Sequence, residues 1–125
     1  MWAQGDYPAV SLLLQPCAAG LAALCDIGSG LKVLDVAAGT GNFALAAAAR
    51  GAKVTACDLT PHMVDLGRAR TEAEGREIEW LEGDAEELPF ADQSYDLVAS
   101  VFGAMFAPRP ERVAAELCRV WGIQR

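Results

Sequence analysis

The sequence has few of the features that mark proteins of nucleic acids, membranes or metals. Its ten Lys and Arg residues are outnumbered by seventeen Asp and Glu residues and form no cluster, which argues against binding to nucleic acid or to an anionic membrane surface. No apolar run approaches the roughly 18 residues that cross a bilayer. One histidine, and four cysteines without a C-x-x-C pair, favour neither a zinc site nor a redox motif. We therefore expect a soluble, cytoplasmic protein, and these absences exclude little about small ligands.

What the sequence does contain is a regular alternation of strand-like and helix-like segments. The 125 residues, 53% of them hydrophobic, are sufficient for one globular domain spanning 1–125. Period-two or continuous apolar patterns predict strands over 31–37, 53–58, 77–84 and 95–102. Helical patterns predict helices over 42–50, over 61–75 with Thr60 as the N-cap, and over 110–121, with a further helix in the N-terminal segment 1–28. This alternation is typical of an α/β domain with a mostly parallel, doubly wound sheet.

Small residues and acids follow each predicted strand. Ligands of an open parallel sheet bind at the carboxyl ends of its strands. Gly39 and Gly41, after the first strand, allow a ligand to approach the backbone closely, although this pattern alone is shared with dinucleotide-binding proteins. Asp58, about 20 residues further on, is placed to accept hydrogen bonds from ribose hydroxyls. Together they indicate an adenosine ligand.

Two further acids separate the candidate ligands. Asp35 lies inside the first strand, where a pyrophosphate would be repelled and an ammonium group would be attracted. Asp84 can accept a hydrogen bond from an exocyclic amine, and the N–H of Ala85 can donate to a ring nitrogen, as adenine requires. A ligand with an adenine, a ribose and a cationic amino-acid tail fits all three acids.

The motifs VLDVAAGTGN, VTACDLTPHM, GDAEELPFADQSYDLV and SVFGAMFAP, in this order and spacing, resemble the N-terminal part of class I S-adenosylmethionine-dependent methyltransferases. The similarity is to the small-molecule type, which includes the ubiquinone and menaquinone biosynthesis C-methyltransferases, and it runs from Trp2 to about Val120. The resemblance implies a Rossmann-like doubly wound sheet of order 3-2-1-4, with a lid segment at 1–28 and a core at 31–125.

The resemblance also implies a role for each matching residue, with S-adenosyl-L-methionine as the cofactor. The methionine portion would be surrounded by the first-strand residues, the ribose bound by the acid after the second strand, and the adenine contacted by the residues that follow the second and third strands. The implied cofactor-binding residues are Asp35, Ala37, Gly39, Gly41, Asp58, Leu59, Met63, Asp84, Ala85, Ser100 near the methyl group, and Tyr7 in the lid. No catalytic residue and no metal ligand is implied.

The resemblance stops where the family continues through an Arg-Pro-Gly-Gly turn and this chain reads WGIQR. We therefore expect a fold that is truncated after the fourth strand and its helix, with the acceptor side missing. The fourth strand would become an apolar edge strand, which favours a homodimer through that edge or through the uncovered sheet face.

Four functional hypotheses follow. The first is methyl transfer to a small-molecule acceptor, and the second is capture of S-adenosylmethionine without turnover. The third, an NAD-dependent oxidoreductase, accounts for the two glycines and Asp58 but not for Asp35 and Asp84. The fourth is a structural remnant without a ligand. His62 is interpreted as a solvated side chain at a helix start rather than as a base.

Overall fold

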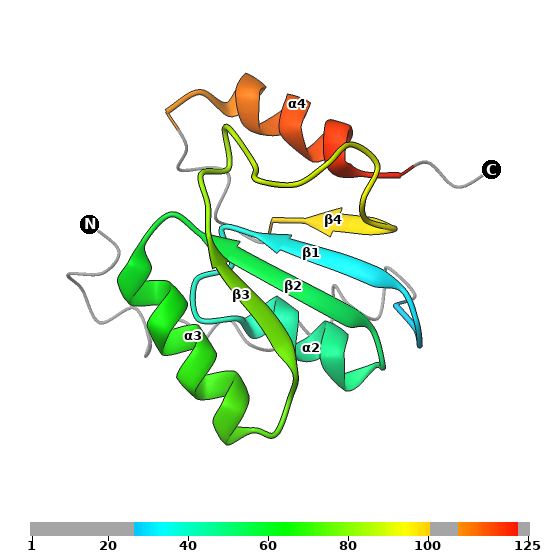
Figure 1. Ribbon diagram of the computed structural model, residues 1–125, viewed down its shortest axis with the longest axis vertical. Coiled ribbons are helices and arrows are strands. Elements are labelled where there is room, and N and C mark those ends of the chain that lie inside the picture. The colour runs from blue at the N-terminus through cyan, green and yellow to red at the C-terminus, as the bar shows by residue number, and fades with distance from the viewer. Residues whose placement is uncertain (1–26, 101–107, 123–125) are drawn as a thin grey trace.

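The computed structural model describes residues 27–100 and 108–122, which form a four-stranded parallel sheet with three helices (Figure 1). The strands are β1 (Lys32–Val36), β2 (Lys53–Asp58), β3 (Ile78–Glu82) and β4 (Leu97–Ala99), and the helices are α2 (Asn42–Ala49), α3 (Pro61–Ala73) and α4 (Pro110–Val120). The strand order is β3-β2-β1-β4, and every neighbouring pair is parallel. The predicted fold class and order are confirmed, and all four carboxyl ends meet at one edge.

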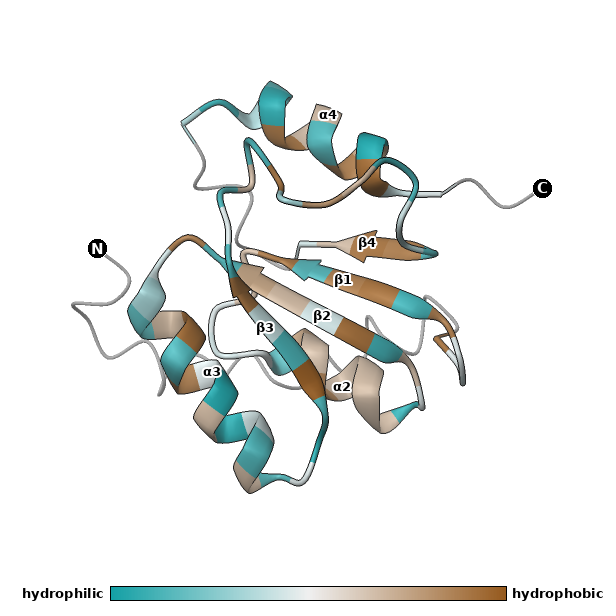
Figure 2. Cartoon of the chain, viewed as in Figure 1, coloured by the Kyte–Doolittle hydropathy of each residue, from teal (hydrophilic) through white to brown (hydrophobic). Residues whose placement is uncertain are grey.

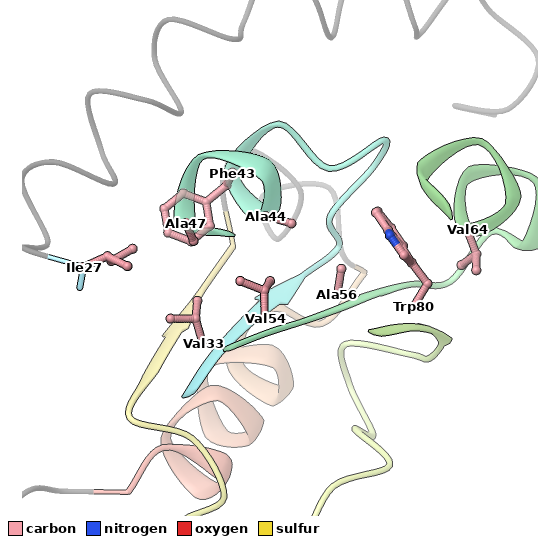
Figure 3. Close-up of a cluster of buried hydrophobic side chains, with 9 residues drawn as sticks. All are labelled: Ile27, Val33, Phe43, Ala44, Ala47, Val54, Ala56, Val64 and Trp80. Carbon is pink, nitrogen blue, oxygen red and sulfur yellow. The ribbon is translucent and has the colours of Figure 1, made fainter. Parts of the chain in front are cut away.

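Helices α2 and α3 pack on one face of the sheet (Figure 1). The core there consists of inward side chains from β1, β2 and β3 against the small and aromatic residues of the helices, which Figure 3 shows: Ile27, Val33, Phe43, Ala44, Ala47, Val54, Ala56, Val64 and Trp80. Four of the eight residues of α2 are buried, because its alanines allow the helix to lie close to the strands. The helix that begins one residue after Gly41 is therefore held rigidly at the carboxyl end of β1.

Helix α4 packs on the opposite face, together with the segment 83–95 that connects β3 to β4. Its buried cluster contains Leu34, Val36, Cys57, Leu88 and Val120. The three inner strand residues alternate with those that face α2 and α3, as expected for a sheet that is covered on both faces. Figure 2 shows the hydrophobic residues of the strands against the more hydrophilic surfaces of α3 and α4.

Three strands are shorter than predicted: β1 lacks the predicted residues 31 and 37 at its ends, and the third and fourth strands differ more. The third ends at Glu82 rather than at residue 84, because Asp84 turns to pair with Glu87 in an isolated antiparallel bridge. The fourth starts at Leu97 rather than at residue 95, because Tyr95 pairs instead with Trp121, just after α4. Its predicted continuation through 101–102 lies outside the described residues.

The predicted N-terminal helix and most of the predicted lid segment 1–28 also lie outside the described residues, so the division of the chain into lid and core stays a prediction. Within 27–100 and 108–122, none of the helices combines the length and the apolar character that a bilayer span requires.

Trp80 fills a slot that two glycines leave open. Its indole is 4% exposed, and its Nε1–H donates to Thr71 Oγ1 at 3.2 Å. A Cβ atom at Gly67, in α3, would lie 2.3 Å from the ring, and one at Gly41, before α2, would lie 2.9 Å from it. The ring of Trp80 therefore sets how closely α3 and the start of α2 approach β3.

We predict that Gly67→Ala lowers the free energy of unfolding by about 1–3 kcal/mol, because the new methyl group overlaps a buried ring. Alanine has the higher helix propensity by about 1 kcal/mol, so a net loss is a lower limit on the cost of the overlap. Urea unfolding measures it. Gly28→Ala is the control, since nothing lies within 4 Å of that position. A Gly67→Ala variant as stable as the wild type would contradict this packing.

Candidate functional site

The segment that joins β1 to α2 contains three residues in the left-handed region of backbone conformation. Ala37, Gly39 and Gly41 have φ angles of 55°, 61° and 93°. The N–H of Ala38 donates to the carbonyl of Cys57 at 2.9 Å, which ties this turn to β2. A left-handed alanine is unfavourable by roughly 1–2 kcal/mol, and such residues persist where the surroundings hold them in place. The turn is therefore held by its contacts rather than by local preference.

Asp58 provides a second contact between this turn and the end of β2. Its Oδ2 accepts the N–H of Gly39 at 2.9 Å, and its Oδ1 accepts the N–H of Thr60 at 3.0 Å. Thr60 is the N-cap residue of α3, as predicted, but its own side chain makes no capping hydrogen bond. Each carboxylate oxygen of Asp58 has a second lone pair, so this acid can hold the turn and still accept a ligand hydroxyl.

Asp35 is a buried acid in β1 that contacts the first turn of α2. It is 1% exposed, and its Oδ2 accepts the N–H of Ala44, in the first helical turn, at 3.1 Å. Burial raises the pKa of Asp35 from 3.8 to about 8; the Ala44 hydrogen bond opposes the shift, and the charge of Asp58 adds to it. Asp35 is therefore mostly protonated at neutral pH, and a cation beside it would lower its pKa.

Asp84 and Ala85 lie beside the end of β2, as the sequence predicts. The N–H of Gly83 donates to the carbonyl of Asp58 at 3.0 Å, which brings the two predicted ligand-binding acids to adjacent loops. Asp84 is exposed, and its Oδ1 accepts the N–H of Glu86 at 2.9 Å. Ala85 is half-buried against the α4-side core.

Two arginines near α4 hold the segment that carries Asp84. The side chain of Glu86 is 7% exposed and lies 2.7 Å from Nε of Arg109. Arg119 donates to the carbonyls of Leu88 at 3.0 Å and Phe90 at 2.8 Å. The sequence analysis missed both arginines, because neither lies at a strand end and their acceptors are 23 to 31 residues away along the chain.

Glu116 links the same helix to the same segment. Its Oε1 accepts the N–H of Leu88 at 2.7 Å, and its Oε2 lies 2.7 Å from Nε of Arg119. The hydrogen bond from Arg119 holds the pKa of Glu116 below its usual value. Helix α4 therefore acts on the site through the loop that follows β3.

The other predicted residues are placed differently from one another. Leu59, next to Asp58, is 65% exposed, which is unusual for a large apolar side chain and provides a surface for a flat ring. Met63 is only 2% exposed, so its side chain lies in the interior. Ser100 is half-buried just after β4, and Tyr7 lies outside the described residues. His62 is exposed in the first turn of α3, as interpreted from the sequence.

Neither the Cys57 thiol nor the Phe90 ring has an evident chemical role at the site. Burial raises the pKa of the Cys57 thiol to about 12, so this cysteine stays protonated and is a poor nucleophile. Phe90 packs edge-on against Tyr95, with ring centroids 5.4 Å apart, as a core residue. Among the residues that the structure describes, no three His, Cys, Asp or Glu side chains gather where they could hold a metal ion.

Known proteins resemble this chain in sequence and in fold. The model of a family described as a methyltransferase domain matches residues 33–122. An uncharacterised protein of Mycobacterium tuberculosis is 50% identical over 121 residues, which are 96% of this chain and 44% of that protein. A demethylmenaquinone methyltransferase of Clavibacter sepedonicus is 41% identical over 92 residues, 74% of this chain and 37% of that enzyme. The chain thus spans less than half the length of either relative.

Among solved structures, a SAM-dependent methyltransferase from Aquifex aeolicus superposes with a TM-score of 0.71 at 25% sequence identity. The match covers 77% of this chain and 53% of that chain. The similarity therefore extends over most of the described sheet and helices, which include the strand ends analysed above.

We predict that Asp35 makes the ligand-free chain less stable as the pH rises. Between the unfolded pKa of 3.8 and the folded pKa of about 8, the folded chain binds one more proton at this residue than the unfolded chain. This contribution is complete below the unfolded pKa and is lost as the pH rises through the folded pKa, over a range of up to about 6 kcal/mol.

Asp35→Asn should remove most of this decline between pH 5 and 8 and should be the more stable protein at pH 8, which urea unfolding across that range measures. The matched control is Asp65→Asn, because the Asp65 side chain is 76% exposed on α3. Equal slopes for the wild type and Asp35→Asn would contradict the shifted pKa.

Proposed function

This chain belongs to the methyltransferase domain family, and we propose that it binds S-adenosylmethionine at the carboxyl ends of its strands and serves methyl transfer to a small-molecule acceptor. The observation that supports the proposal best is the meeting of two acids at one glycine-containing turn. Asp35 lies at its start, and Asp58 bonds to its centre at Gly39.

The chemistry of these residues fits a cationic adenosine ligand. The carboxylate of Asp35 would accept a hydrogen bond from an ammonium group, and that of Asp58 would accept from the ribose. Asp84 and the N–H of Ala85 would contact the edge of the adenine, whose face would lie on Leu59. The acids Asp58 and Asp84 give a negative potential at this edge of the sheet, and a ligand that carries an ammonium and a sulfonium would in addition favour the ionised form of Asp35.

When bound, S-adenosylmethionine supplies an electrophilic methyl group on sulfur. The residues of this chain would act by orienting the cofactor, since a displacement at that carbon depends mainly on how the two reactants are placed. Ala37 and Gly41 would surround the methionine portion, and Ser100 would lie near the reacting end. We assign no general base, and the acceptor side of the proposal rests on the family alone.

Two of the alternative hypotheses are less well supported. An NAD-dependent oxidoreductase would place a pyrophosphate near Asp35, and an anionic ligand, unlike a cationic one, would gain no attraction from that buried carboxyl. A remnant without a ligand gives no reason to bury an acid whose pKa is raised to about 8. Capture of the cofactor without turnover stays the main rival of catalysis, because both use the same residues.

Titration calorimetry with S-adenosylmethionine, S-adenosylhomocysteine and NAD tests the binding proposal. We expect the first two ligands to bind and NAD not to bind. Asp58→Ala should weaken S-adenosylhomocysteine binding by about 10- to 100-fold, because it removes hydrogen bonds to a charged acceptor. Asp65→Asn is again the control. Binding of NAD alone would support the oxidoreductase, and binding of none of the three would support the remnant.

We also propose a homodimer through the outer edge of β4. One side of Leu97–Ala99 pairs with β1. On the other side, in the part of the chain that the structure describes, Trp121 pairs only with Tyr95 and the N–H of Gly122 donates to the Tyr95 carbonyl at 2.7 Å. Within those residues the edge of β4 itself has no second strand, and such an edge favours strand pairing between chains.

Light scattering across micromolar concentrations should give the mass of a dimer. A mass of one chain throughout that range would rule the dimer out.

A further inference from the structure

Arg70, in the second half of α3, contacts the turn between β1 and α2 at residues other than the one that Asp58 contacts. Its side chain is 18% exposed. The Nη1 atom lies 2.8 Å from Asn42 Oδ1, 3.3 Å from Thr40 Oγ1 and 3.4 Å from the carbonyl oxygen of Thr40. A single guanidinium nitrogen therefore joins the residues on both sides of Gly41.

The contact with the carbonyl of Thr40 restricts the peptide unit between Thr40 and Gly41. In a trans peptide the C=O and N–H groups point in opposite directions. The carbonyl points to Arg70, so the N–H of Gly41 points away from it and donates to the carbonyl of Ala38 at 3.0 Å. The ring of Trp80 also packs against this turn, and it leaves no space for a Cβ atom at Gly41.

An ordinary surface ion pair does not account for this arginine. Its Nε lies 3.5 Å from Glu74 Oε2, and the Glu74 side chain is 49% exposed, so that pair contributes little. The Nη1 atom of the guanidinium contacts the turn instead. Arginine suits this position because Nη1 contacts the turn while Nε lies beside Glu74, and the single nitrogen of a lysine would not hold both positions.

We propose that Arg70 is a positioning residue that holds the turn from Gly39 to Asn42 in the conformation that receives the cofactor. The inference rests on the proposed function, because Arg70 acts through Thr40 and Asn42 rather than on a ligand. Asp58 fixes the turn at Gly39, and Arg70 fixes it on both sides of Gly41. The segment is thus pre-organised before any ligand arrives, which reduces the entropy lost on binding.

The test compares Arg70→Met with Arg68→Met. Methionine keeps an unbranched apolar stem of similar length and removes the guanidinium. Arg68 lies on the same helix and donates to the carbonyl of Trp80 at 3.1 Å, but the contacts described above do not include it. Hydrogen exchange of the amides of residues 38–43 is measured in the ligand-free chains, and S-adenosylhomocysteine affinity is measured by calorimetry.

We expect Arg70→Met to exchange these amides about tenfold faster than Arg68→Met does and to bind S-adenosylhomocysteine about tenfold more weakly, at a similar unfolding midpoint. Equal exchange rates and equal affinities in the two variants would overturn the proposal. If the wild type does not bind the ligand, the proposed function fails, and the exchange rates still decide whether Arg70 holds the turn.

A second variant tests whether Arg70 acts through Asn42. Asn42→Ala should weaken binding or speed the exchange of the turn in the wild type and have little further effect in Arg70→Met, because residues in one hydrogen-bond network are not additive. Full additivity of the two changes would show that the arginine does not act through Asn42 and would overturn that part of the proposal.

Discussion

The hydrogen bond from the N–H of Gly39 to the carboxylate of Asp58 is the contact on which the geometry of the site depends. It joins the turn after β1 to the end of β2 at 2.9 Å, and the same carboxylate binds the N–H of Thr60 before α3. One acid thus positions two loops and the start of one helix. The parallel sheet makes this possible, because it brings the carboxyl ends of strands distant in sequence to one edge.

The buried carboxyl of Asp35, at the same site, lowers the stability of the folded chain as the pH rises. Asp35 lies beside α2, and the loss of solvent and the nearby charge of Asp58 raise its pKa. Buried carboxyls of this kind are typical of functional sites rather than of stable cores, because a leucine would fill the space without a penalty. A cation at this position would offset the cost of burying the Asp35 carboxylate. Stability, protonation and ligand binding are therefore connected through this one residue.

The sequence predicted the parallel order of the strands and the convergence of acids at their ends, because apolar periodicity and strand–helix alternation follow directly from local residue types. It did not predict that Met63 is buried, since the rotation of α3 depends on how Trp80 packs. It also missed Arg70 and Arg119, whose partners lie 27 to 31 residues away on other elements. Such contacts follow from tertiary packing, for which one sequence carries no local pattern.

The most direct test of the account is the number of protons released when S-adenosylmethionine binds. Calorimetry at pH 6.5 in buffers of different ionisation enthalpy measures this number. If a cationic ligand binds beside Asp35, the carboxyl should lose its proton and close to one proton should be released per ligand, because its pKa of about 8 lies above the working pH. Binding without proton release would contradict the placement of the cation at Asp35, and with it the central claim about this site.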